Sequence, residues 1–159
     1  LLPRRRRHLG RPRKPPCHPP RKPPPAATSR SFFDALRSPQ DAERAGALRK
    51  LSSVLEQLEE GGDAGEVTEL CAQLRARGSM VDIGQCAGSL NDMVHQPALL
   101  LLATLTTTDF DPWAGETKRL IKAGGVHELI WPHLFSNIAL TVASTCAVLQ
   151  NTSARRRRR

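Results

Sequence analysis

One stretch of 38 residues, 116–153, restricts the fold of this chain more than any other. Its apolar residues recur at helical spacing in three segments, and each segment is bounded by residues that stop or start a helix. Gly124 and Gly125 follow the first segment, and glycine readily takes the left-handed conformation that ends a helix. Ser136 or Asn137 can cap the third. The segments are 116–123, 126–135 and 138–150, and together they predict an all-α protein.

The apolar positions predict which face of each segment is buried. The first segment offers Leu120, Ile121 and the aliphatic part of Lys122. Pro132 lies inside the second segment and is expected to distort it, because proline lacks the N–H that a helix interior needs. The apolar residues of the second and third segments are Val126, Leu129, Ile130, Leu134 and Phe135, and Ile138, Val142, Ala143, Cys146 and Leu149.

A short helix, a glycine turn, a second helix, a polar cap and a longer third helix in this order resemble one armadillo repeat. The run Lys122-Ala123-Gly124-Gly125-Val126 is similar to the family's Ala-Gly-Ala/Gly-Ile/Val junction between its first two helices. Val148-Leu149-Gln150-Asn151 is similar to the Ala-Leu-x-Asn that closes its third. The resemblance implies an α-α superhelix whose stacked repeats bury their apolar faces on one another.

Helical signals continue upstream. Residues 41–58 carry apolar side chains at i, i+3 and i+4 spacing, with Ser38-Pro39 expected as the cap and first turn. The glycines at 61 and 62 are expected to end this helix. The apolar residues of 31–36 can pack on it as an end cover.

A second three-helix unit is predicted over 64–108. Helices over 66–77, which Gly78 closes, and 80–94 precede a helix that Pro97 opens. Residues 98–103 are apolar on every side, and a helix without a polar face must be covered all round. We therefore expect the centre of the core there.

These units, about 38–58, 64–108 and 116–153, correspond to two to two and a half repeats. Their third-helix leucines are 51, 105 and 149, with gaps of 54 and 44 residues, whereas armadillo repeats have a period of about 42. Since at least about three repeats are normally needed, the ends are expected to be capped atypically, or neighbouring repeats to be missing from this chain.

Charge divides the chain into three parts. Residues 1–30 hold ten Lys/Arg, no acid and nine of the thirteen prolines, so a disordered, extended segment is expected. Residues 155–159 are all arginine, and the part between holds nine Lys/Arg against fifteen Asp/Glu. The predicted domains are thus a basic segment 1–30, a helical domain 31–153 with a net charge of −6, and a tail 154–159.

The N-terminal basic residues allow three functional interpretations. A nuclear import signal is a loose pattern that they fit. A mitochondrial or plastid presequence is less favoured, because the prolines prevent the amphipathic helix that it needs. Residues 10–15 resemble an AT-hook, which lies in narrow A·T-rich minor grooves, although Leu9 stands where its first arginine should be. The candidate contacts are Arg4, Arg5, Arg6, Arg7, Arg11, Arg13 and Lys14.

The cysteines at 17, 71, 86 and 146 show no paired spacing, and the last three fall on apolar helix positions, so they are expected to be buried free thiols. No apolar run approaches the roughly 18 residues of a membrane span. We expect an intracellular, soluble protein of the nucleus or cytoplasm, an organelle being less favoured, without membrane association.

No catalytic, cofactor or metal site is predicted. His127-Glu128 with His133 departs from the zinc-protease motif, because Trp131 stands where the second histidine should be. His8, His18 and His95 are expected at the surface or in caps. The loop 109–115 has too few oxygen ligands for calcium, so turn and cap roles are expected for its aspartates, with Phe110 and Trp113 packed on the repeat.

The resemblance also suggests where a partner binds. In importin-alpha and its relatives, a third-helix asparagine holds the peptide backbone and a tryptophan four residues earlier forms a pocket for basic side chains. Asn151 matches the asparagine, and Ala147 replaces the tryptophan. The earlier units offer Thr107 and Ser53 at the asparagine position. A role for Asn151 as an ordinary residue of a helix C-terminus is the alternative.

The sequence therefore predicts a non-enzymatic scaffold of armadillo type that binds a protein or peptide along its third-helix surface. The acidic domain is expected to attract basic peptides, or the arginine tails themselves. The alternative is a nuclear, nucleic-acid-associated protein whose basic tails bind DNA or RNA, non-specifically through phosphate.

Overall fold

The computed structural model of the chain describes residues 33–62 and 64–153. Within these ranges all regular secondary structure is helical, which confirms the all-α prediction. A short helical turn over residues 33–36 comes first. It is followed by α2 (Asp41–Glu60), α3 (Ala64–Ala76), α4 (Ser79–Ala87), α5 (Asp92–Leu105), α6 (Ala114–Ala123), α7 (Val126–Ile130), the 3-10 helix η1 (Trp131–Phe135) and α8 (Ala139–Ser153).

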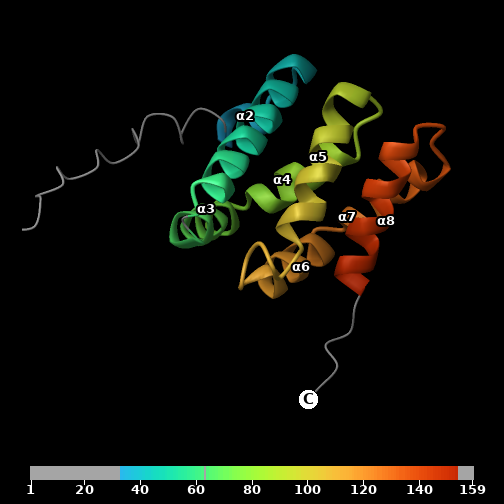
Figure 1. Cartoon of the computed structure of the whole chain (residues 1–159). Coiled ribbons are helices and arrows are strands. Elements are labelled where there is room, and N and C mark those ends of the chain that lie inside the picture. Colours follow the sequence, from blue (N-terminus) through green and yellow to red (C-terminus); the bar gives the residue numbers. More distant parts are fainter. Residues whose placement is uncertain (1–32, 63, 154–159) are drawn as a thin grey trace, which may run out of the picture.

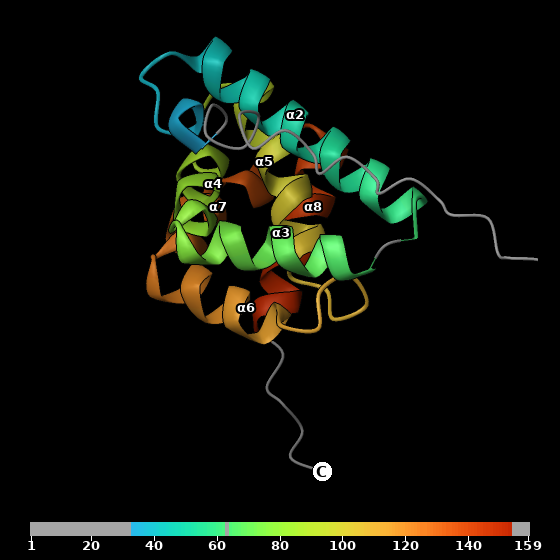
Figure 2. The ribbon, with the colours of Figure 1, turned by 90° about the vertical axis from the view of Figure 1, so that its left-hand side faces the viewer.

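Three long helices, α2, α5 and α8, lie side by side in one layer with α5 in the middle (Figure 1). Seen from the α2 side, α4 and α7 stack on one another at one side of this layer (Figure 2). Helix α4 also packs against α5 and α6, and α6 packs against α8. Helix α3 packs on α2, and η1 packs with α6 on α8.

Helix α5 is the centre of the core, as predicted. Ala98, Leu99 and Leu102 are fully buried, because α5 packs on α2, α4 and α8 at once. The expectation that residues 98–103 are covered on every side is wrong, since Leu100 is 50% exposed. One face of α5 therefore stays open between its two neighbours.

The predicted helix over 80–94 is two helices. Helix α4 ends at Ala87, and Asn91 starts α5 by accepting a hydrogen bond from the backbone N–H of Met93 at 3.0 Å. Leu90, an apolar residue inside the predicted helix, lies in the intervening turn and is 95% exposed. Pro97 lies inside α5 and does not open it. The asparagine cap, which the apolar pattern hid, decides this boundary.

The N-terminal cover forms over α4 and its flanks. Leu36 is buried, and its carbonyl oxygen accepts a hydrogen bond from the Cys86 thiol at 3.6 Å. Phe33 is buried with the guanidinium of Arg77 over its ring. Ser38 does not cap α2, because the helix begins at Asp41 with Gln40 as its N-cap. The Ser38 hydroxyl instead accepts a hydrogen bond from the N–H of Gln40 at 3.1 Å.

The glycine signals in the unit 116–153 act as predicted. Gly124 follows α6, and Gly125 has a φ of +68°, in the left-handed region that favours glycine. A side chain at Gly124 would lie 3.1 Å from a methyl carbon of Val81, so this glycine also lets α6 approach α4 closely. Beyond Ile130 the segment continues as the 3-10 helix η1, with Pro132 near its start. The predicted distortion by proline is confirmed.

The buried face of α8 is not the predicted one. The side chains that α8 buries are Thr141, Ser144, Thr145, Val148 and Thr152, while Ala143 and Cys146 are exposed. The Thr145 hydroxyl donates to the carbonyl of Thr141 at 2.7 Å, so this buried hydroxyl has a hydrogen-bond partner within its own helix. Small hydroxyl residues allow close packing on α5, and periodicity of apolar residues alone misses such a face.

Exposed apolar residues correct other expectations. Trp113, expected to pack on the repeat, is 57% exposed, and Phe135, expected on the buried face of its segment, is 82% exposed. In α6 the buried side chains are Ala114, Thr117 and Ile121, and Leu120 and Lys122 point outward. The apolar periodicity predicted where these helices lie in the sequence, but it predicted only some of the side chains that they bury.

Two of the cysteines are buried free thiols, as predicted. Burial raises the pKa of the Cys71 thiol to about 12, and burial also raises the pKa of Cys86. Cys146 is free but exposed, which corrects the expectation for that residue. Cys17 lies outside the described residues.

Candidate binding pocket at the ends of α2, α5 and α8

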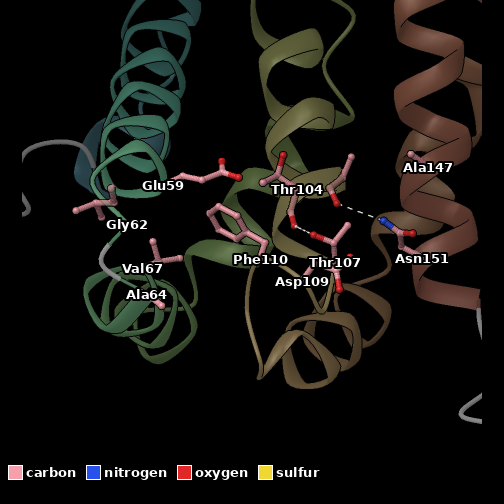
Figure 3. Close-up of a pocket in the computed structure, with 12 residues that line it drawn as sticks. Glu59, Gly62, Ala64, Val67, Thr104, Thr107, Asp109, Phe110, Ala147 and Asn151 are labelled. Carbon is pink, nitrogen blue, oxygen red and sulfur yellow. Dashed lines mark hydrogen bonds between the residues drawn. The ribbon is translucent and has the colours of Figure 1, made fainter.

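A cavity of about 570 Å³ lies where the C-terminal ends of the three long helices meet the start of α3 and the loop after α5 (Figure 3). Helix α2 stops here because Gly61 caps it and Gly62 turns the chain with a φ of +69°. The lining residues are Leu58, Glu59, Gly62, Ala64, Val67, Ala103, Thr104, Thr107, Asp109, Phe110, Ala147 and Asn151.

Three of the four predicted partner-binding residues line this cavity. Thr107, Ala147 and Asn151 come together there from α8 and from the segment that follows α5. Ser53 does not, and its side chain is exposed on α2. It precedes the lining residue Leu58 by five positions, which places the two about 140° apart around the helix.

The amide of Asn151 is used inside the protein. Its Nδ2 donates to the carbonyl oxygen of Ala103 at 3.3 Å and to the hydroxyl oxygen of Thr106 at 3.1 Å. Since a carbonyl oxygen only accepts, this orientation of the amide is fixed. The side chain ties the last turns of α8 to the end of α5, and its Oδ1 accepts no hydrogen bond from another described residue.

The threonine hydroxyls in the cavity wall also donate their hydrogen bonds to backbone carbonyls of the protein. Thr104 donates to the carbonyl of Leu100 at 3.2 Å, and Thr107 donates to the carbonyl of Thr104 at 2.8 Å. Each hydroxyl oxygen keeps its lone pairs as acceptors. The side-chain donors of the wall are therefore used, while side-chain acceptors remain.

Two carboxylates complete the polar part of the wall. Glu59 stands on the last turn of α2 and Asp109 on the loop after α5, and neither side chain has a partner among the described residues. No lysine or arginine of the described part of the chain lines the cavity. Leu58, Val67 and the half-buried ring of Phe110 supply the apolar part, and Phe110 packs against the core.

A buried ion pair fixes the loop that carries Asp109 and Phe110. The guanidinium of Arg75 on α3 pairs with the carboxylate of Asp111, with side-chain exposures of 8% and 0%. Arg75 also donates to the hydroxyl of Thr117 at 3.2 Å, which ties α3 to α6. Asp111 Oδ1 accepts from the N–H of Trp113 at 3.0 Å, which confirms the predicted turn role. No local pattern marked Arg75, because its partner lies 36 residues away.

The histidines pair in a way that the sequence did not suggest. His95, expected at the surface or in a cap, is 4% exposed and stacks on His133 with ring centroids 4.2 Å apart. His133 donates to the carbonyl of Ala87 at 2.8 Å, and His95 donates to the carbonyl of Ser89 at 3.1 Å. These bonds join η1 and α5 to the turn after α4.

The ionisation of two histidines is shifted by these surroundings. Burial, followed by the neighbouring His133, lowers the pKa of His95. Burial, followed by the charge of Lys122, lowers the pKa of His127. His127 also hydrogen-bonds the Thr152 hydroxyl at 2.5 Å. Within 33–62 and 64–153, no three metal-ligating side chains gather into a site, and no helix is long and apolar enough to cross a membrane.

Comparison with known proteins gives no assignment. No family model matches the sequence, and no curated protein or solved structure matches it significantly. The predicted import-signal and nucleic-acid contacts all lie in 4–14, outside the described residues.

Proposed function

We propose that this chain is a non-enzymatic, armadillo-type scaffold that binds a peptide or protein along the surface of its third helices, α2, α5 and α8. The observation that carries the proposal is the cavity at the ends of these helices, which three residues predicted from the armadillo resemblance line. The open face of α5, with Leu100 half exposed between α2 and α8, extends the same surface away from the cavity.

Selection of peptides against the full chain tests this proposal. Peptides enriched from a random library should lose binding to the Thr107→Trp variant, because an indole at this lining position fills part of the cavity. Thr108→Trp is the matched control, since Thr108 is exposed and does not line the cavity. Selected peptides that bind both variants as well as the parent protein would refute the proposal.

A second function is supported by charge alone. Ten Lys/Arg in residues 1–30 and five arginines at 155–159 would bind DNA or RNA through phosphate contacts. The affinity for duplex DNA should then fall steeply with salt, and removing these two segments should abolish it. Tight binding that is retained after their removal would exclude this mode.

A further inference from the structure

The side chains of the cavity wall present one kind of hydrogen-bonding group to a ligand. The side-chain donors of Asn151, Thr104 and Thr107 are used within the protein. What these residues still offer are oxygen lone pairs, to which Glu59 and Asp109 add carboxylates that have no partner among residues 33–62 and 64–153. A wall of acceptors accommodates a group that only donates hydrogen bonds, and protein side chains of that kind are the ammonium of lysine and the guanidinium of arginine.

Charge favours the same ligand. Of the described residues that line the wall, Glu59 and Asp109 are the charged ones, and no lysine or arginine is among them. Figure 3 shows the side chain of the lining residue Glu59 extending from α2 in the direction of Phe110 and α5. An aromatic ring beside it can hold a cation or the aliphatic stem of a long basic side chain.

We infer that the cavity is a recognition pocket for one lysine or arginine side chain of the peptide bound under the proposed function, on which this inference rests. The stem packs on Leu58, Val67 and Phe110, and the charged end lies between Glu59 and Asp109. The tryptophan that makes a basic pocket in importin-alpha is replaced by Ala147, so this pocket is built from other residues: the end of α2 and the loop after α5.

The test uses peptides that differ at one position. The sequence acetyl-Ala-Ala-X-Ala-Ala-amide, with arginine, lysine, citrulline, leucine or glutamate as X, is titrated into the full chain and followed by amide chemical shifts. The arginine and lysine peptides should shift the amides of Thr107, Phe110 and Asn151 and bind at least about tenfold more tightly than the citrulline peptide, because a charged donor facing carboxylates is favoured over a neutral one. Glutamate should not bind.

Two variants of equal charge separate a specific pocket from general attraction to an acidic protein. Glu59→Gln should weaken the arginine peptide several-fold, whereas Glu60→Gln, the neighbouring residue outside the cavity wall, should leave it unchanged. Equal weakening by both variants would overturn the inference, as would equal affinity for arginine and leucine.

The same data distinguish the two levels of the proposal. Leucine and arginine peptides that shift the same lining amides equally, and lose these shifts in Thr107→Trp, would remove the preference for a cation and leave the binding surface standing. Peptides of any kind that shift only amides remote from the cavity would overturn the inference, and library selection then decides the proposed function separately.

Discussion

The ion pair between Arg75 and Asp111 should dominate the stability of the loop that carries Asp109 and Phe110. Arg75→Met keeps most of the side-chain volume but leaves the fully buried carboxylate of Asp111 with only the N–H of Trp113 as a partner. Removing one member of a buried pair typically costs about 3–5 kcal/mol. With a urea m-value of about 2 kcal/mol/M, the unfolding midpoint should fall by roughly 1.5–2.5 M.

A second substitution tests whether the loss comes from the unpaired charge. In Arg75→Met/Asp111→Asn the charge is gone, and the side-chain oxygen can still accept from Trp113. This double variant should therefore recover a large part of the lost stability. Urea unfolding followed by circular dichroism gives all values of the double-mutant cycle.

The exposed pair between Arg37 and Asp82 is the control. The Arg37 side chain is 57% exposed, so Arg37→Met should change the midpoint far less. The reasoning is refuted if Arg75→Met lowers the unfolding free energy by less than about 1 kcal/mol, or if Asp111→Asn does not rescue it.

Two further predictions concern packing and pH. Gly84→Ala should destabilise the protein by about 1–3 kcal/mol, because the added methyl would overlap the side chain of Val126. Gly46→Ala has open space around it and should stabilise the protein by about 0.5–1 kcal/mol. Equal effects of the two variants in urea unfolding would contradict the packing of α4 on α7. Because the pKa of His95 is lowered in the folded protein, the unfolded chain binds more protons between that lowered pKa and about 6.5. Stability should therefore fall as pH drops from 7.5 through this window. His95→Gln should reduce this dependence, and the part that remains is expected from His127, whose pKa is also lowered; an unchanged slope would show that His95 does not contribute.

The helices could be placed from sequence because their signals are local. Glycines at 61, 62, 78, 124 and 125 bound the helices that they were expected to bound, since a left-handed or tightly packed position admits little else. The apolar series of α2 predicted its buried face well: Leu48, Leu51 and Leu55 are all in the core. The boundary between α4 and α5 was not predicted, because apolar periodicity alone does not detect an asparagine cap within a run of residues that are compatible with a helix.

The predicted buried faces were wrong where the place of a helix among its neighbours, and not its apolar periodicity, decided which side chains are buried. Helix α8 buries threonines against α5 and leaves Cys146 outside, because its hydroxyls satisfy themselves on the helix backbone and allow close approach. The pocket residues Thr107, Ala147 and Asn151 were found only through the family resemblance. Glu59 and Phe110 were not assigned to the site, since nothing local shows that the end of α2 faces the loop after α5.

The sequence by itself determined that this chain forms helices, where most of them begin and end, and that its acidic part lies between basic ends, since these follow from local conformational preference and composition. Tertiary structure alone decided what those helices enclose. Arg75 meets Asp111, His95 meets His133, and Glu59 and Asp109 come to line one cavity, because packing joins segments that lie tens of residues apart. Nothing in the spacing of these residues along the chain indicates the contacts.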